Sequence, residues 1–126
     1  MHPMNRRDFL KTSSAFAGLS ILPASVWSES PNSRLQIVQV GVWNRGQGNL
    51  ESLLRLPNIE MVGLCDVDST FLGNASELAP GAKTFSDYRE MFDKLDSDID
   101  AVLVATPDHM HSSVALAAME RGKHVY

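Results

Sequence analysis

Alternation of short apolar runs with segments of helical spacing is the feature that most constrains this fold. Strands are predicted at 35–40, 59–65, 82–85 and 101–105, and a fifth begins at 123–126. Apolar side chains recur at helical spacing between them, over 49–56, 68–78, 86–95 and 111–121. This order is typical of βαβ units. We therefore expect an α/β fold with a doubly wound parallel sheet, incomplete at its C-terminal end.

The first 33 residues have the pattern of an export signal. Arg6-Arg7 is followed by Phe-Leu-Lys and then by a weakly apolar stretch over 15–22, which resembles a twin-arginine leader. We expect 1–33 to be a flexible signal peptide and linker and 34–126 to be the folded domain. The protein would then engage the twin-arginine export machinery and be periplasmic, or be tethered to the membrane by an uncleaved leader. An ordinary basic N-terminal helix is the alternative.

Charge and cysteine content exclude some classes of protein. The net charge is −4 and the isoelectric point is about 5.4, which gives no electrostatic reason to bind nucleic acid. The single cysteine, Cys65, cannot form an internal disulfide. A length of 126 residues allows one domain.

A glycine-containing segment follows the first predicted strand. Gly41 and Gly46 occupy the first and third places of the dinucleotide fingerprint G-x-G-x-x-G, and Trp43 occupies the second. A side chain at the second place must point away if phosphates are to approach the backbone. We expect this loop to hold a pyrophosphate through Gly41, Trp43, Asn44, Arg45 and Gly46. A purely structural glycine turn is the alternative.

Asp66 ends the second predicted strand, about 20 residues beyond Gly46. A carboxylate at this place accepts hydrogen bonds from the adenosine ribose and repels a 2′-phosphate, which favours NAD over NADP. The alternative is that Asp66 caps the next helix. For Asp68 we expect the capping role.

The segment after the fourth strand should line the ligand crevice of a doubly wound sheet. Thr106, Pro107, Asp108 and His111 are the candidates there. His109 and His111 would face different sides of a helix, so we expect no metal site.

Several segments together resemble the Gfo/Idh/MocA oxidoreductases, whose N-terminal domain is an NAD(P)-binding Rossmann fold. They are Thr106-Pro107-Asp108-His109-Met110-His111, the alanine-rich 115–118, Gly122-Lys123-His124-Val125, and the segments 62–66 and 87–91. The resemblance implies that Thr106, Pro107, Asp108 and His111 lie near the nicotinamide, and that Asp66 lies near the adenosine ribose.

The resemblance also implies a function: the NAD-binding domain of an exported oxidoreductase that acts on a sugar or polyol hydroxyl. The family's catalytic lysine follows the fifth strand, and a substrate domain comes after it. We therefore expect a C-terminally truncated fragment that holds no catalytic residue and is inactive alone, with any oligomer formed through the missing domain. The alternatives are an NAD-dependent glycosidase of the same family, a non-catalytic nucleotide-binding or scaffolding protein, and a methyltransferase.

Overall fold

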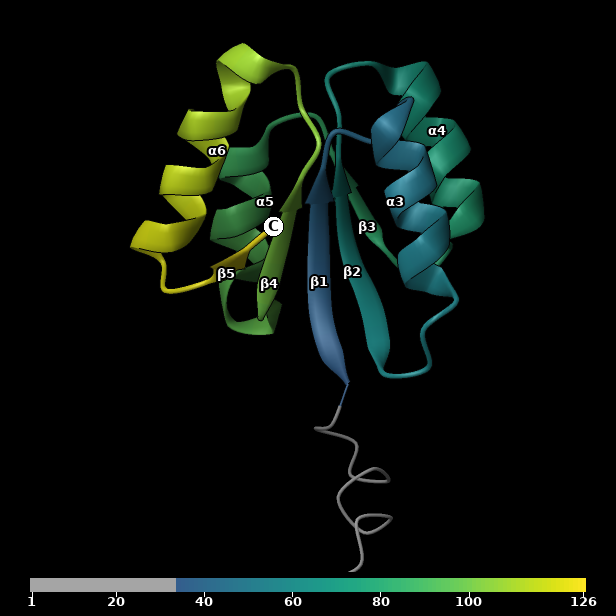
Figure 1. Ribbon diagram of the computed structural model, residues 1–126, viewed down its shortest axis with the longest axis horizontal. Helices are drawn as coiled ribbons and strands as arrows, with labels where there is room; N and C mark the ends of the chain where they lie inside the picture. The colour runs from purple at the N-terminus through teal and green to yellow at the C-terminus, as the bar shows by residue number, and fades with distance from the viewer. Residues whose placement is uncertain (1–33) are drawn as a thin grey trace, which may run out of the picture. The chain divides into compact units, whose positions relative to one another are not determined.

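The computed structural model describes residues 34–126, which form one parallel five-stranded sheet of order β3-β2-β1-β4-β5 (Figure 1). The strands are β1 (Leu35–Val40), β2 (Ile59–Cys65), β3 (Lys83–Phe85), β4 (Ala101–Val104) and β5 (His124–Val125). The predicted doubly wound α/β fold is confirmed. The leader expected at 1–33 lies outside the described residues.

Helices cover both faces of the sheet. They are α3 (Arg45–Leu54), α4 (Ser69–Leu78), α5 (Tyr88–Leu95) and α6 (Asp108–Glu120), with a short 3-10 helix, η3 (Asp96–Asp98), after α5. In Figure 1, α3 and α4 lie on one face and α5 and α6 on the other. This arrangement follows from right-handed βαβ crossovers that run outward from β1 in opposite directions.

Each face has its own apolar core, and β1 contributes to both because successive side chains point to opposite faces. Ile37 packs with Leu50 and Leu64 on the α3 and α4 side. Val38 packs with Phe92 and Val114 on the α5 and α6 side. The central strand is therefore buried on both faces from Ile37 to Val40, where three of the four residues are apolar.

The strand boundaries agree closely with the prediction, whereas two helices begin earlier than expected. Helix α3 begins at Arg45 rather than Asn49, and α6 begins at Asp108 rather than His111. The first turn of α3 carries only glycine, polar and charged side chains, and that of α6 carries one apolar side chain, Met110, so apolar spacing gives little signal at either start. Helix α5 is capped by Asp87, whose side chain accepts a hydrogen bond from the backbone N–H of Arg89.

Strands β2 and β3 are added on one side of β1, and β4 and β5 are added on the other side. The candidate site lies at this change of side, between β1 and β4. Val40 pairs with Cys65 of β2 on one side and with Val104 of β4 on the other, so the carboxyl ends of three strands meet. The loop after β1 leads to α3 on one face, and the loop after β4 leads to α6 on the other (Figure 1). Diverging loops at such a point open a crevice in doubly wound sheets.

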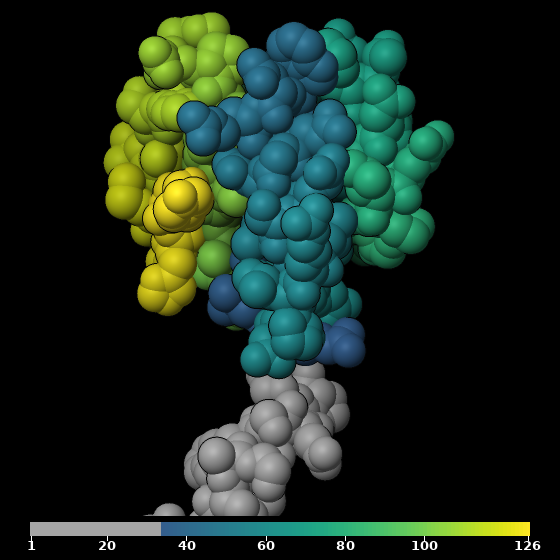
Figure 2. All heavy atoms as spheres, turned by 45° about the vertical axis from the view of Figure 1, so that its right-hand side comes forward, coloured from purple at the N-terminus to yellow at the C-terminus, as the bar shows by residue number. Residues whose placement is uncertain are grey.

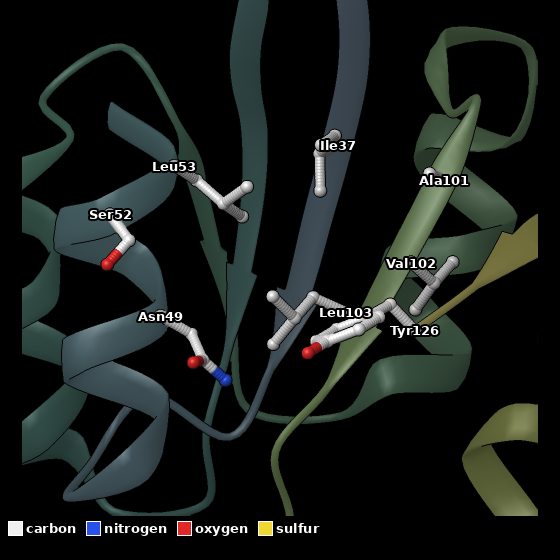
Figure 3. A pocket seen from close by; sticks show the side chains of 8 residues that line it. All are labelled: Ile37, Asn49, Ser52, Leu53, Ala101, Val102, Leu103 and Tyr126. Atoms are coloured by element: carbon white, nitrogen blue, oxygen red, sulfur yellow. The ribbon is translucent and has the colours of Figure 1, made fainter. Parts of the chain in front are cut away.

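A separate hollow of about 320 Å³ lies between α3 and β4 (Figure 3). In Figure 2 the C-terminal end of the chain, in yellow, lies beside α3. The walls are mainly apolar, with Ile37, Leu53 and Leu103 among them, and the polar side chains are those of Asn49, Ser52 and Tyr126. No charged group converges on this hollow, and none of the predicted site residues lines it.

Within residues 34–126, no helix combines the length and apolar character needed to cross a membrane.

Candidate functional site

Gly41 and Gly46 are required by close backbone packing. Gly41 has φ +88°, and a Cβ there would lie 2.5 Å from the carbonyl oxygen of Ala105 in the loop after β4. A Cβ on Gly46 would collide with the carbonyl oxygen of Gly41. The positive φ of Gly41 gives the tight turn and Gly46 lets α3 start against it, which are the roles that the fingerprint assigns to these glycines. Gly41 also lets the ends of β1 and β4 approach each other.

Trp43 stands at the second place of the fingerprint, and its ring is held by a neighbouring helix. The indole stacks on Phe71 of α4, with ring centroids 4.7 Å apart and planes inclined by 22°. Trp43 is still 56% exposed. Asn44, which follows it, is the one non-glycine residue of 34–126 with a positive φ, at 53°. The chain thus turns sharply after Trp43 into the first turn of α3.

Gln39 supports the glycine loop from below, and the sequence pattern did not identify it. Its side chain is fully buried in β1, and Nε2 donates to the carbonyl oxygens of Gly41 at 2.8 Å and Gly46 at 2.7 Å. Its Oε1 has no partner among the described residues. A polar side chain between Val38 and Val40 of the central strand was the available signal, because a buried polar group needs partners.

The carboxylate of Asp66 joins the end of β2 to the glycine loop. Its Oδ2 accepts a hydrogen bond from the backbone N–H of Val42, and its Oδ1 accepts one from that of Asp68, both at 2.9 Å. Each carboxylate oxygen can accept a second hydrogen bond, so Asp66 keeps acceptor capacity on its exposed side.

The predicted cap at Asp68 is confirmed. Its carboxylate accepts from the backbone N–H groups of Thr70 at 2.8 Å and Phe71 at 3.2 Å, at the start of α4.

A cavity of about 420 Å³ brings most of the candidate residues together at the carboxyl ends of the strands. It is lined by Gly41, Trp43, Asn44, Arg45, Asp66, Thr106 and Pro107, with Val67, Asp68, Phe71 and Ala105. This volume lies within the range of small-molecule and cofactor sites. Arg45 brings a positive charge to the wall, and the first turn of α3 brings backbone N–H groups, which favour anions.

A second hollow, of about 350 Å³, shares Gly41, Asp66, Thr106 and Pro107 with this cavity and extends along the start of α6 to His109 and Met110. Thr106 Oγ1 is buried and has no partner in the described part of the chain. A buried hydroxyl without a partner is a group that a bound ligand or water can satisfy. The two hollows together follow the edge of the sheet from β2 to α6.

Three predicted site residues do not line either hollow. Gly46 is buried beneath the loop, and Asp108 and His111 are exposed in the first turn of α6. Asp108 makes no capping hydrogen bond; Pro107 is the N-cap residue of α6. The ligand contacts expected of Asp108 and His111 stay predictions.

Cys65 lies directly below the site at the end of β2. Burial, and the nearby carboxylates of Asp66 and Asp87, raise the pKa of its thiol to about 12. The thiol is therefore protonated at neutral pH and is a poor nucleophile. Across residues 34–126, no three His, Cys, Asp or Glu side chains gather as metal ligands would.

Comparison with known proteins identifies the family. Residues 35–126 match the Gfo/Idh/MocA family, described as an oxidoreductase family with an NAD-binding Rossmann fold. A glycosyl hydrolase family 109 protein of Stenotrophomonas maltophilia (strain K279a) is 34% identical over 132 residues, which cover 97% of this chain and 29% of that protein.

Solved structures of dehydrogenases and NAD-binding proteins have the same fold as this domain. Myo-inositol 2-dehydrogenase from Lactobacillus plantarum matches with a TM-score of 0.67 and 25% identity, covering 73% of this chain and 27% of that one. GenD2 from gentamicin A biosynthesis, solved in complex with NAD, also gives a TM-score of 0.67 at 25% identity, covering 74% and 26%. The chain spans less than a third of each relative. It belongs to the Gfo/Idh/MocA oxidoreductase family, and residues 35–126 correspond to that family's NAD-binding Rossmann domain.

Proposed function

We propose that this domain binds NAD in the cavity between the glycine loop, Asp66 and the loop after β4. The observation that carries the proposal is the placement of the Asp66 carboxylate, which lines this cavity and retains free acceptor positions. Asp66 would hold the adenosine ribose hydroxyls, and the backbone N–H groups that start α3 would hold the pyrophosphate.

The residues present fit a dinucleotide. Ribose hydroxyls are donors that match the Asp66 carboxylate, and phosphates match the α3 terminus and Arg45. Thr106 lines both hollows, and its buried, unpartnered Oγ1 would offer a further hydrogen-bonding group to a ligand. When bound, NAD supplies hydride acceptance, while this domain's residues bind and orient it.

We propose NAD rather than NADP as the cofactor. The carboxylates of Asp66 and Asp68 both line the cavity at the end of β2. A 2′-phosphate at the adenosine ribose would meet both negative charges, whereas a 2′-hydroxyl would donate to Asp66.

For the whole protein we propose oxidation of a sugar or polyol hydroxyl, which the inositol dehydrogenase relative supports. The family 109 relative favours a second candidate, a glycosidase that oxidises its substrate only transiently. Incubating the full-length protein with NAD and candidate polyols or glycosides distinguishes them. A dehydrogenase accumulates NADH, whereas a glycosidase releases a free sugar without net NADH.

Displacement of bound NADH, followed by its fluorescence, tests the cofactor proposal itself. NAD should displace NADH at lower concentration than NADP, and S-adenosylmethionine should not displace it. Binding of S-adenosylmethionine without binding of NADH would indicate a methyltransferase. A folded protein that binds neither compound would be a non-catalytic member of the family.

We also propose twin-arginine export, on the sequence of residues 1–33 alone. Replacing Arg6 and Arg7 by lysine should retain the protein in the cytoplasm of the expressing cell, whereas Arg34→Lys, outside the pattern, should leave export unchanged. Fractionation that finds both variants exported equally would contradict this.

A further inference from the structure

A pair of stacked aromatic rings forms part of the wall of the candidate cofactor cavity. Trp43 replaces the second glycine of the fingerprint and stacks on Phe71, with centroids 4.7 Å apart. Both residues line the same cavity as Asp66. The indole is 56% exposed although Phe71 covers one of its sides, so its remaining apolar surface is open to a ligand.

Hydrogen bonds from backbone N–H groups to two carboxylates fix this aromatic pair relative to Asp66. Oδ1 of Asp66 accepts from the N–H of Asp68, and the Asp68 carboxylate accepts from the N–H of Phe71. On the other side, Oδ2 of Asp66 accepts from the N–H of Val42, the residue before Trp43. Both rings are therefore connected to Asp66 through short segments of ordered backbone.

A nucleoside whose ribose binds Asp66 has its base attached to the same sugar ring. The base must then lie within one nucleoside length of that carboxylate, and Trp43 and Phe71 line the same cavity as Asp66. Flat purine rings bind well against exposed aromatic faces, since every base has a π-face.

We propose that the Trp43–Phe71 pair is a stacking wall for the adenosine half of the dinucleotide, so that Trp43 is a binding residue where the fingerprint has glycine. This inference rests on the proposed function and deepens it. A glycine at this place lets the backbone approach the pyrophosphate closely. Trp43 would give up that approach and would contact the adenosine instead.

The substitution Trp43→Gly separates this proposal from its opposite, because it restores the fingerprint glycine. If Trp43 is a stacking wall, the variant should bind NAD and ADP-ribose about tenfold more weakly, the loss expected when one base–aromatic stack is removed. If Trp43 instead obstructs the phosphates, the variant should bind more tightly. Nicotinamide mononucleotide, which lacks adenosine, should bind both proteins equally.

Two further variants keep the test decisive if Trp43→Gly fails to fold by circular dichroism. Trp43→Phe keeps an aromatic ring and should retain NAD affinity within about threefold, whereas Phe71→Leu removes the supporting ring and should weaken NAD and ADP-ribose together. Calorimetric titration of the full chain measures all of them. Unchanged or tighter binding of ADP-ribose by Trp43→Gly, or by Phe71→Leu, overturns the stacking wall. The proposed function stands in that case if the wild type binds NAD. A folded wild type that binds no NAD overturns both.

Discussion

The carboxylate of Asp66 accepts a hydrogen bond from the backbone N–H of Val42 at 2.9 Å, across 24 positions of the chain. This bond ties the end of β2 to the glycine loop that follows β1. The same residue lines the candidate cofactor cavity. Asp66 thus stabilises the loop and, under the proposed function, has a second role, which is to present acceptors to NAD.

Both roles should be lost in Asp66→Ala. The free energy of unfolding should fall by about 1–3 kcal/mol, because the N–H groups of Val42 and Asp68 lose their acceptor. The Kd for NAD should rise at least about tenfold, as expected when a charge-assisted hydrogen bond is lost. Urea unfolding and calorimetry measure the two effects. Asp98→Ala, at an exposed acid of η3, is the control, and equal behaviour of the two variants would contradict the assignment.

Replacing the buried Gln39 by leucine should destabilise the glycine loop. The variant leaves the carbonyl oxygens of Gly41 and Gly46 without their Nε2 donor, so the free energy of unfolding should fall by about 1–3 kcal/mol. Gln36→Leu on the same strand, at a partly exposed position, should change it by about 0.5 kcal/mol or less. The amide hydrogens of residues 41–46 should exchange faster in Gln39→Leu than in the wild type. Exchange as slow as in the wild type would show that Gln39 does not hold the loop.

Two glycine-to-alanine substitutions should act in opposite directions. Gly41→Ala combines a positive φ with a Cβ 2.5 Å from the Ala105 carbonyl oxygen, so it should lower the melting temperature sharply or prevent folding. Gly48→Ala, in the interior of α3 with open space around its Cβ, should raise the free energy of unfolding by about 0.5–1 kcal/mol. Thermal unfolding of both variants and the wild type measures these effects. A Gly41→Ala variant with the melting temperature of the wild type would show that the loop packs differently.

The raised pKa of Cys65 predicts a loss of stability in alkaline solution. The folded protein holds the thiol proton up to about pH 12, whereas the unfolded chain releases it near the ordinary value of 9.0. The stabilisation is therefore complete below pH 9 and is lost as the pH rises from 9 toward 12, with a slope of at most about 1.4 kcal/mol per pH unit.

Cys65→Ala isolates this contribution from those of other alkaline groups. Denaturant unfolding of both proteins across this pH range should give a steeper decline for the wild type. Parallel pH profiles would mean that the thiol is not held in its protonated form. At pH 8, a thiol reagent should modify the unfolded chain much faster than the native one.

Strands and topology were predictable because apolar, β-branched runs with intervening helices leave few arrangements open. The run 101–105 is apolar at every position, which is typical of a parallel strand that is buried on both faces. Asp66 was also predictable as a site residue from its distance to the glycine loop.

The side-chain partnerships were not predictable, because they join residues that only the folded chain brings together. Gln39 appears in the sequence as an exception in an apolar strand, and its carbonyl partners lie in the next turn and helix. Phe71 reads as an ordinary helical apolar residue until the fold sets its ring against Trp43. Helix starts were missed for a related reason, because backbone geometry and glycine packing determine them rather than apolar spacing.

A crystal structure of the protein grown with NAD shows directly whether this cavity holds the cofactor. We expect the adenosine ribose hydroxyls to lie within hydrogen-bond distance of the Asp66 carboxylate and the pyrophosphate to lie at the first turn of α3. NAD bound elsewhere on the molecule, or bound with its adenosine ribose away from Asp66, would show that the glycine loop and Asp66 do not form the cofactor site.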